Sequence, residues 1–478
     1  MSLPEYGIDF NSLEKEIYKI CCKTGREILK TVLESYDRAL STERDKGIYR
    51  HKGLRGTTIK TIMGEVEYER AIYEQKTDEG TKCYVYLLDE AMGIKGSGFF
   101  SGLMSEIISK ASCEGTYREA ARSVSELTGQ TISHTAAWNV VQDLGERVDE
   151  QEQKAAALAA NNQGVGELDA KVLFEEQDGI WLKTQGETRK KHGASIEMKV
   201  AIAYDGAKVT IAKKSGKKRR ELTNKVACAN FESTGKFQKR KEGVIAGTYN
   251  VDEIETRLVN GDGAAWIKFA AADDNAHFQL DPFHRNKAIF RAAPDENARK
   301  TMLKMLYSKE INELLIYIDA LANSVEDEKQ EISLRELHKY FTNNIGGLIP
   351  CKRRGLDLPQ PPEGKEYTNM GGMESNIFTI IGNRMKGRRA CWSVDGGNNL
   401  ARLLCLKATK KLSETLQILT DMVLPGKYSE EIIVGFSSSK VANSVGKGYN
   451  GIHQAAAPAT SDYKWLRNIG ALQPLCEI

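Results

Sequence analysis

The spacing of apolar residues changes twice along this 478-residue chain, and these changes limit the folds that it can adopt. Residues 171–280 contain short apolar runs, some alternating and some continuous, which indicate β-strands. Residues 285–345 instead keep apolar side chains at helical spacing almost throughout. Because the chain is too long for one ordinary core, the pattern predicts a multidomain α/β protein in which a strand-rich part is followed by an all-helical stretch.

The spacing of apolar residues predicts a mainly helical N-terminal third. Residues 10–33 carry apolar side chains at helical spacing, and residues 57–73 alternate on either side of Gly64, which predicts a β-hairpin. Five cations make this hairpin region basic: Arg50, His51, Lys52, Arg55 and Lys60.

Two further helices are expected at residues 117–127 and 133–144, with Gly129 in the turn between them. This order is the outline of a helix-turn-helix, whose second helix enters the DNA major groove. An ordinary pair of antiparallel helices has the same outline, so both interpretations stay open. The side chains that would face DNA are His134, Thr135, Asn139 and Gln142.

The remaining elements follow the same reasoning. A connecting helix is expected at residues 150–162, and further helices are expected after Met373 and at 403–422. The expected strands comprise residues 171–183, 198–204, 208–212, 255–260 and 276–280.

A formal net charge of +3 is too small to predict a nucleic-acid partner. The cations are concentrated between residues 213 and 241, however, and clustered cations neutralise phosphates. A solvated lysine-rich loop explains the same pattern. On the nucleic-acid interpretation the contacts are Lys217, Arg219, Arg220, Lys239 and Arg240.

Three acidic residues are candidates for a catalytic role. Asp178 lies inside a strand-like run, Asp262 lies between two glycines after an apolar strand, and Glu374 begins a helix. An acid in a buried strand is costly unless it is paired or bound to a metal. Each acid taken alone fits a structural role, and Glu175 or Glu176 competes with Asp178.

Two-metal phosphodiester chemistry uses such a set of acids. Two Mg²⁺ ions about 3.5–4 Å apart stabilise the attacking and the leaving oxygen. Mg²⁺ takes one or two carboxylates and substrate oxygens as ligands. Three converging carboxylates therefore predict such a site.

Other features exclude several classes of protein. The nine cysteines contain no C-x-x-C pair, so we expect reduced thiols and neither a zinc module nor a disulfide framework. No apolar run reaches 18 residues, and the N-terminus lacks a secretory pattern. We therefore expect a cytoplasmic protein.

Three motifs in order resemble the DDE transposases of the bacterial mutator-like class, above all the ISLre-type insertion-sequence family. The motifs are Phe-Glu-Glu-x-Asp-Gly-x-Trp at residues 174–181, Asn-Gly-Asp-Gly-x-x-Trp-Ile at 260–267, and Met-Glu-Ser-Asn with a later Arg-x-Lys-x-Arg at 373–392. The resemblance covers residues 50–410 and implies a metal-binding triad of Asp178, Asp262 and Glu374.

The resemblance also implies an RNase H-like mixed-sheet core with the helical insertion between the second and third acids. It implies two Mg²⁺ ions, for which Mn²⁺ substitutes, and a reaction in which water cuts the element end and the freed 3′-OH attacks target DNA. Asp281 stands where the class has a cysteine. His284 orients a phosphate or the attacking water, or is a structural histidine. The DNA contacts on this part of the chain are His284, Arg285, Arg384, Lys386 and Arg388.

Six segments are expected. They are an N-terminal helix with the basic hairpin (1–95), a helix-turn-helix-like DNA-binding region with a connecting helix (96–165), the first part of the core (166–284), the helical insertion (285–350), the rest of the core (351–436) and a flexible tail (437–478).

The expected function is transposition of an insertion sequence, with terminal inverted repeats and target DNA as partners. We expect a homodimer or larger complex on DNA, a nucleoid-associated location and no membrane contact. The alternatives are an RNase H-like nuclease without strand transfer and an inactive DNA-binding protein.

Overall fold

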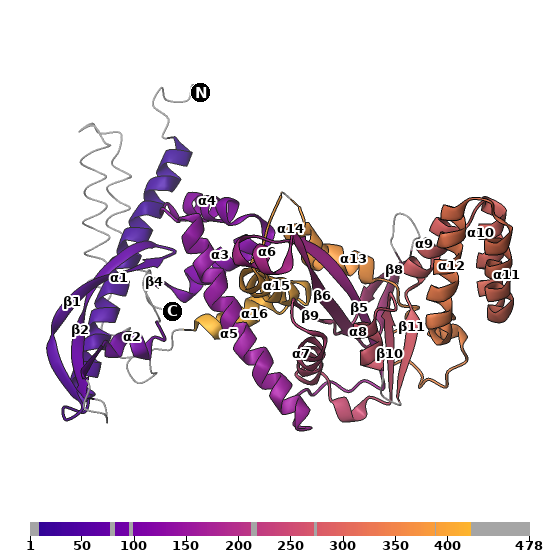
Figure 1. The fold of residues 1–478 in the computed structure, drawn as a ribbon. Coiled ribbons are helices and arrows are strands. Elements are labelled where there is room, and N and C mark those ends of the chain that lie inside the picture. Colours follow the sequence, from indigo (N-terminus) through magenta and orange to yellow (C-terminus); the bar gives the residue numbers. More distant parts are fainter. Residues whose placement is uncertain are drawn as a thin grey trace, which may run out of the picture. The chain divides into compact units, whose positions relative to one another are not determined.

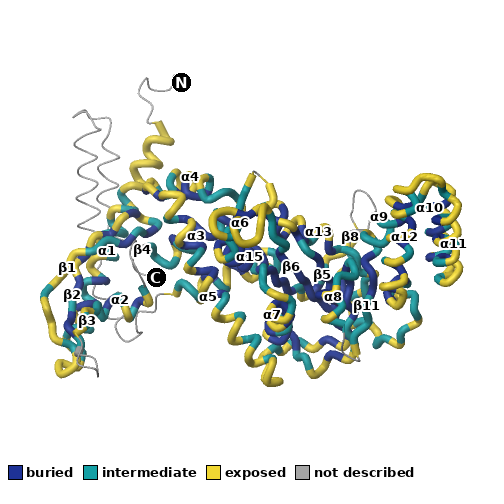
Figure 2. The backbone as a smooth tube through the Cα atoms, in the orientation of Figure 1, coloured by how far each residue is buried: buried dark blue, intermediate teal, exposed yellow. Residues whose placement is uncertain are grey.

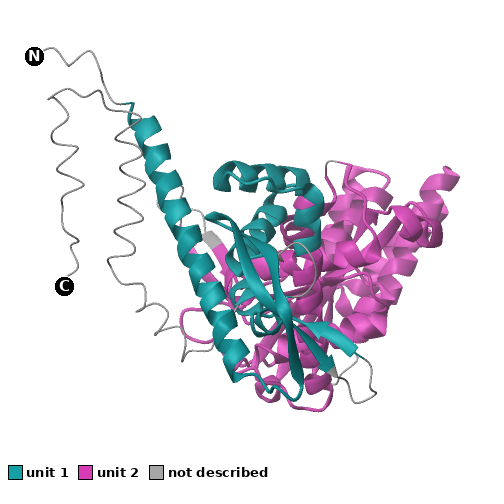
Figure 3. Ribbon diagram, turned by 90° about the vertical axis from the view of Figure 1, so that its left-hand side faces the viewer, with its two compact units in different colours: residues 1–140, 416–478 teal, residues 141–415 magenta. Residues whose placement is uncertain are grey.

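The computed structural model describes residues 9–76, 82–94, 99–211, 218–271, 275–387 and 389–421. Two compact units divide the chain, residues 1–140 with 416–478 and residues 141–415 (Figure 3). The six expected segments are a finer division and remain predictions. Four expected features lie outside the described residues or side chains, and these are Lys217, Arg388, the side chain of Arg219 and the tail at 437–478.

The first unit is built on a long helix and a β-hairpin. Helix α1 (Phe10–Glu43) packs along β2 (Gly64–Lys76), which pairs antiparallel with β1 (Tyr49–Thr61). Gly64 begins β2 at a φ of +124°, a conformation that favours glycine. The expected hairpin is therefore present, and it is longer than expected because the basic residues before Thr57 also pair. The core of this unit consists of Leu33, Tyr36, Ile59, Val66, Tyr68, Leu88 and Met92.

Short elements complete the sheet of this unit. Its strand order is β3-β2-β1-β4. The bounds are β3 (Lys82–Val85), α2 (Leu87–Ala91), β4 (Phe99–Phe100) and α3 (Gly102–Glu114).

The two helices expected around Gly129 are present as α4 (Tyr117–Thr128) and α5 (His134–Ala160). Thr116 and Glu119 cap α4 reciprocally, and Gly129 ends it in the left-handed conformation at a φ of +68°. The expectation of a separate connecting helix at 150–162 was wrong, because α5 continues to Ala160 without a break.

Gly145 lies inside α5, at a close contact with the segment around Asn399. A Cβ at this position would lie 2.4 Å from the Cβ of Asn399. The glycine therefore serves a close packing contact and does not terminate the helix.

The second unit contains a five-stranded mixed sheet in the order β11-β10-β5-β6-β9 (Figure 1). The central strand β5 pairs antiparallel with β6, which pairs antiparallel with β9. On its other side β5 pairs parallel with β10, which pairs parallel with β11. The bounds are β5 (Val172–Lys183), β6 (Ser195–Tyr204), β9 (Val226–Asn230), β10 (Thr256–Gly261) and β11 (Ala276–Leu280).

Sequence analysis missed β9. All five of its residues are buried, but the run is short and follows a lysine-rich segment, so only its pairing with β6 identifies it. The strand expected at 208–212 forms β7 (Ala207–Ile211), which pairs with β8 (Lys218–Leu222) as a separate two-stranded sheet.

Helices cover the sheet, so β5 and β6 are buried along most of their length (Figure 2). Helix α7 (Thr234–Ala246) lies on the face of β5 that carries Glu175 and Gln177. The smaller elements of this part are α6 (Gly186–His192), a 3₁₀ turn at Val251–Glu253, α8 (Ala265–Lys268) and a second turn at Phe269–Ala271.

The expected all-helical stretch is present as four helices that share one core (Figure 1). Their bounds are α9 (Pro282–Ala292), α10 (Glu296–Ser308), α11 (Ile311–Ser324) and α12 (Glu328–Asn343), followed by 3₁₀ turns at Ile345–Gly347 and Cys351–Arg353.

After a long loop the chain forms α13 (Met373–Ile377), a π-helical turn (Phe378–Gly382) and α14 (Asn383–Met385). The single helix expected at 403–422 is instead two helices, α15 (Val394–Ala408) and α16 (Leu412–Thr420). Lys410, at a φ of +63°, separates them. Helix α15 begins early because its Gly- and Asn-rich first turns are buried, so packing overrides their weak helix propensity.

No helix in the described part of the chain has the length and apolar character needed to cross a membrane.

Candidate metal centre

Strand β5 carries three acidic side chains on two faces. Glu175 faces α7, whereas Glu176 and Asp178 face the other side, because side chains alternate along a strand. Glu175 is fully buried and pairs with Lys241, and its Oε1 lies 3.1 Å from a guanidinium nitrogen of Arg257. Two cations thus compensate its charge, and its side chain points away from Asp178.

Asp178, His284 and Glu374 form a tight group on the other face. Oδ2 of Asp178 lies 3.4 Å from Nε2 of His284, and one ligand atom of each residue lies within 4.8 Å of the others. Ligand atoms on opposite sides of an octahedral Mg²⁺ ion lie about 4.2 Å apart, twice a bond of about 2.1 Å. Small side-chain rotations would therefore close this group around one ion.

The three members of the group come from different elements. Asp178 is buried on β5, His284 is partly buried near the start of α9, and Glu374 is exposed at the start of α13. The hydrogen bond to Asp178 raises the pKa of His284, although burial opposes this effect. Because one member of the group is exposed, a ligand from solvent can approach it.

Asp262 lies near this group without belonging to it. It follows β10 directly, and its Oδ1 accepts a hydrogen bond from the backbone N–H of Ala264 at 2.8 Å. Burial raises the pKa of Asp262, and the negative charge of Asp178 raises it further, whereas His284 lowers it. The three expected acids thus lie in one region, but only Asp178 and Glu374 share the tight group, which His284 completes.

A buried row of polar side chains crosses three neighbouring strands at this end of the sheet. Glu176 on β5 is in register with Asn260 on β10, and Asn260 is in register with Gln279 on β11. The side-chain amide of Asn260 donates to Glu176 at 3.2 Å and to Asp281 at 2.8 Å, and its oxygen accepts from Gln279 at 3.0 Å. The row links the strands through side chains as well as backbone.

Glu176 ties this row to the segment that carries Glu374. Its Oε2 accepts the backbone N–H groups of Gly371 at 2.7 Å and Gly372 at 2.9 Å, and its Oε1 accepts the hydroxyl of Tyr204 at 2.7 Å. Burial raises the pKa of Glu176, and these donors oppose that rise. Four donors thus contact its oxygens, three at Oε2 and one at Oε1, and they fix Glu176 to the segment just before Glu374. Glu176 is not part of the group of Asp178, His284 and Glu374.

Asp281 ties the same row to His284. Its Oδ1 accepts the backbone N–H groups of Phe283 at 2.8 Å and His284 at 3.1 Å, so it caps α9. The acid that replaces the expected cysteine is therefore buried and structural, and it fixes the first turn from which His284 reaches Asp178.

Comparison with known proteins gives a family. The profile of an uncharacterised protein family, UPF0236, matches residues 3–415. This chain belongs to that family. A UPF0236 protein in the vanSb 3′ region of Streptococcus gallolyticus is 22% identical over 401 residues, which cover 82% of each chain. A UPF0236 protein of Caldanaerobacter subterraneus subsp. tengcongensis is 24% identical over 411 residues, covering 83% of this chain and 78% of that protein.

Sequence analysis missed one acid near the centre of this UPF0236 protein. The carboxylate of Glu197 on β6 lies over Gly179, where a Cβ would approach Oε1 of Glu197 to 2.0 Å. Burial raises the pKa of Glu197, Lys199 lowers it, and the negative charges of Asp262 and Asp178 raise it. In the sequence, Glu197 lies on the strand after Asp178 and is separated from it by the rest of β5 and by α6. The only signal for this packing was Gly179, which follows Asp178 directly.

The cations of α7 differ in their surroundings. Arg240 was expected to contact DNA, but it is 5% exposed and pairs with Asp149 at 2.7 Å, Glu152 at 2.9 Å and Glu232 at 2.8 Å. That expectation was wrong, because its guanidinium is enclosed by carboxylates. Lys239, the preceding residue, is exposed and remains a candidate.

The other described cations also differ. Arg285 is half-buried, and it donates to the carbonyl of Leu348 at 2.9 Å, which gives it a structural contact. Arg384 lies over the ring of Trp392, 5.5 Å from its centroid. Arg220 and Lys386 are exposed and remain candidates for DNA contact.

The second of the two expected DNA-binding helices presents His134 and Asn139 to solvent. Gln142, also expected to face DNA, instead accepts a hydrogen bond from Asn399 at 2.9 Å, so its side chain packs inside the protein. The geometry of α4 and α5 leaves the helix-turn-helix interpretation a prediction.

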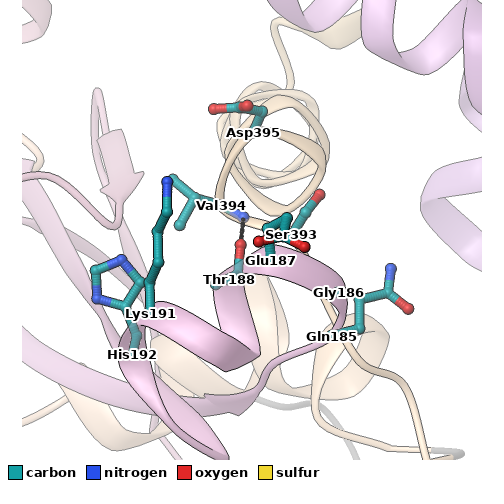
Figure 4. A pocket seen from close by; sticks show the side chains of 9 residues that line it. All are labelled: Gln185, Gly186, Glu187, Thr188, Lys191, His192, Ser393, Val394 and Asp395. Carbon is teal, nitrogen blue, oxygen red and sulfur yellow. Dashed lines mark hydrogen bonds between the residues drawn. The ribbon is translucent and has the colours of Figure 1, made fainter.

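A hollow of about 620 Å³ lies between α6 and the start of α15 (Figure 4). The residues that line it include Lys191 and His192, and the hydroxyl of Thr188 accepts the backbone N–H of Val394 at 3.1 Å. It shares no residue with the group of Asp178, His284 and Glu374.

Proposed function

We propose that this chain is a DDE transposase of the ISLre type, which cuts the ends of an insertion sequence and joins them to target DNA. The observation that carries the proposal is the convergence of Asp178, Glu374 and Asp262 at one end of the sheet, although 84 and 112 residues separate them in turn along the sequence (262 − 178 and 374 − 262). Acids from three motifs that lie far apart in the sequence thus converge on one region, which supports the proposal.

The proposal assigns the sheet to the RNase H-like class. Support comes from its mixed order, in which the central strand β5 carries the first acid, with antiparallel strands on one side and parallel strands on the other. The second acid follows the neighbouring parallel strand, and the four-helix insertion lies between the second and third acids.

The donor set fits divalent cations. Asp178 and Glu374 would hold one ion, and Asp262, beside Asp178, would help to hold a second. An imidazole in the group also suits Mn²⁺, which accepts nitrogen ligands more readily than Mg²⁺. Bound ions would neutralise the charge that develops on phosphate oxygens during an in-line displacement.

The proposed reaction has two steps, and each replaces one bond to phosphorus with another. In the first step the oxygen of water bonds to phosphorus, and the bond to the 3′ oxygen of the element end breaks. In the second step that 3′-OH bonds to a target phosphorus, and the target's own 3′ oxygen leaves. Neither step needs a protein nucleophile, so the chemistry depends on the acids that hold the cations.

One relative has a name that agrees with a mobile element. The name of a UPF0236 protein of Caldanaerobacter subterraneus subsp. tengcongensis joins eleven numbered designations, as repeated copies of one gene in a genome would produce. We extend the proposal to a nucleoid-associated dimer or larger complex, because two element ends must be held together.

One assay tests the proposal. The full chain is incubated with Mg²⁺, a labelled duplex from the DNA that ends the element, and supercoiled plasmid. Joined product supports a transposase. Cleavage without joining would replace the proposal with a nuclease, and retarded mobility without cleavage would replace it with a DNA-binding protein.

A further inference from the structure

The last helix of the insertion contacts the loop that carries Asp262. The hydroxyl of Tyr340 on α12 donates a hydrogen bond to the backbone carbonyl of Asp262, with 2.7 Å between the oxygens. Burial raises the pKa of Tyr340, and the charges of Asp262, Asp281 and Asp178 add to that rise. This hydroxyl is therefore bonded to the main chain of Asp262, in a buried setting where three carboxylates oppose its ionisation.

A second contact involves the next residue of the same loop. Gly263 has a φ of +92°, and a Cβ there would lie 2.5 Å from Oδ1 of Asn344. Asn344 is buried, and its amide donates to the carbonyl of Tyr340 at 2.8 Å, which fixes its orientation. The end of α12 thus packs directly against the turn after Asp262.

A third contact reaches the far side of the loop. The ammonium of Lys268, at the end of α8, donates to the carbonyl of Asn343 at 2.6 Å. The final turn of α12 therefore contacts the segment 262–268 at both ends, through a hydroxyl at one end and a backbone carbonyl at the other.

Helix α12 is itself anchored in the insertion. Leu334, Leu337 and Phe341 point into the core shared with α9, α10 and α11, and Phe341 is fully buried. Because well-packed interiors resist deformation, α12 and the residues at its end hold a fixed position within the four-helix stack. The loop contacts described above therefore connect Asp262 to a rigid body.

We propose that Tyr340 is a positioning residue, through which the helical insertion holds Asp262 in place beside Asp178. This inference rests on the proposed function, since it assigns Asp262 to the metal centre. Tyr340 acts on the backbone of Asp262, and the carboxylate then takes its orientation from the Ala264 N–H in the same loop. An insertion far along the sequence from Asp178 thereby becomes part of the site's framework.

The test compares Tyr340→Phe, which removes only the hydroxyl, with Tyr317→Phe on α11, a tyrosine that packs against the same core. The first measurement is hydrogen exchange of the metal-free full chain over residues 260–268. We expect exchange at Ala264 to rise roughly 3- to 10-fold in Tyr340→Phe, the equivalent of one net hydrogen bond. Exchange over residues 311–324 stays unchanged in Tyr340→Phe, and Tyr317→Phe leaves residues 260–268 unchanged.

The second measurement uses Fe²⁺ with peroxide, which cuts the backbone next to a bound ion. We expect Tyr340→Phe to reduce cutting at residue 262 severalfold relative to cutting at 178 and 374. A general loosening of the fold would not change this ratio.

The two measurements separate the two proposals. Unchanged exchange at Ala264 in Tyr340→Phe would overturn the role of Tyr340 whether or not the protein binds metal. If exchange at Ala264 rises in Tyr340→Phe but Fe²⁺ and peroxide do not cut the unmodified chain, the contact between Tyr340 and the Asp262 loop would stand and the metal centre would be overturned. An unchanged cutting ratio would limit Tyr340 to loop stability and overturn its positioning role.

Discussion

Glu176 and Asp178 lie two residues apart on the same face of β5 but have different surroundings. The carboxylate of Glu176 accepts four hydrogen bonds and is buried within the polar row. The carboxylate of Asp178 accepts its own strand's Gly179 N–H at 2.7 Å and otherwise faces His284 and the group with Glu374. Position along the strand therefore separates a positioning acid from a candidate ligand.

Replacing Glu176 with Gln should weaken both the fold and metal binding. The amide keeps one oxygen for the N–H groups of Gly371 and Gly372, but that acceptor is neutral, so these hydrogen bonds lose their charge assistance. Its NH₂ group would face the hydroxyl of Tyr204, which could no longer donate to this side chain. We expect a loss of about 1–3 kcal/mol in unfolding free energy and weaker Mn²⁺ binding, measured by denaturant titration and calorimetry. Glu187→Gln, at an exposed site on α6, is the control. Unchanged stability and Mn²⁺ affinity would contradict the positioning role.

Replacing Asp262 with Asn should abolish cleavage and joining and leave DNA binding intact. The change removes a negative charge beside Asp178 but keeps an oxygen that accepts the Ala264 N–H. We expect a loss of at least about 1000-fold in rate, on the order of 4 kcal/mol in activation free energy, with an unchanged gel shift. Asp252→Asn, an exposed acid ten residues earlier, should retain full activity. A joining-competent Asp262→Asn protein would remove this residue from the site.

Two neighbouring cations on α7 should give opposite results. Arg240→Ala leaves three carboxylates around a buried gap, so we expect a loss of about 3–5 kcal/mol in unfolding free energy. Lys239→Ala removes an exposed cation, so stability should hold while the slope of log binding constant against log salt falls by about 1. Denaturant titrations and DNA binding at several salt concentrations measure both. Full stability of Arg240→Ala would refute its structural assignment.

Asp89 should make the stability of the protein depend on pH. Burial raises the pKa of Asp89 from 3.8 to about 6, although Arg70 lies 3.0 Å away and opposes the rise. Because the folded pKa lies above the unfolded one, the stability gained from holding this proton is complete below about pH 4. It is lost as the pH rises through about 6, and the difference is at most about 3 kcal/mol, the equivalent of two pKa units.

Thermal unfolding between pH 4 and 8 measures this effect. Asp89→Asn cannot bind the proton, so the decline in stability between pH 4 and 6 should shrink. Glu90→Gln, an exposed neighbour, should keep the decline. Identical pH profiles for Asp89→Asn and the unmodified chain would exclude Asp89 as its source.

Residue spacing alone predicted much of the fold. The helices at 117–128 and 282–343, the hairpin around Gly64 and the strands β5, β6, β10 and β11 follow from periodicity, because each element's burial repeats at its own period. Spacing failed at β9 and at the first turns of α15. There the segment is too short or too polar to show its structure, and packing against distant residues decides it.

The sequence alone could not predict the surroundings of the charged residues. Arg240 and Lys239 are neighbouring cations in the sequence. Three carboxylates enclose Arg240, whereas Lys239 is exposed to solvent. Likewise strand alternation separates Glu175 from the other two acids, but Glu176 and Asp178 differ only in the partners that other strands and helices bring to them.

The sequence by itself determined which acids this protein has, on which kinds of element they stand, and the order in which those elements follow. Only the tertiary structure decided that His284 completes the group of Asp178 and Glu374, that Asp262 stands beside it, and that Tyr340 reaches its loop. The physical reason is that periodicity shows which face of a segment is buried and which is exposed to solvent. A site depends instead on contacts between residues that are dozens of positions apart along the chain.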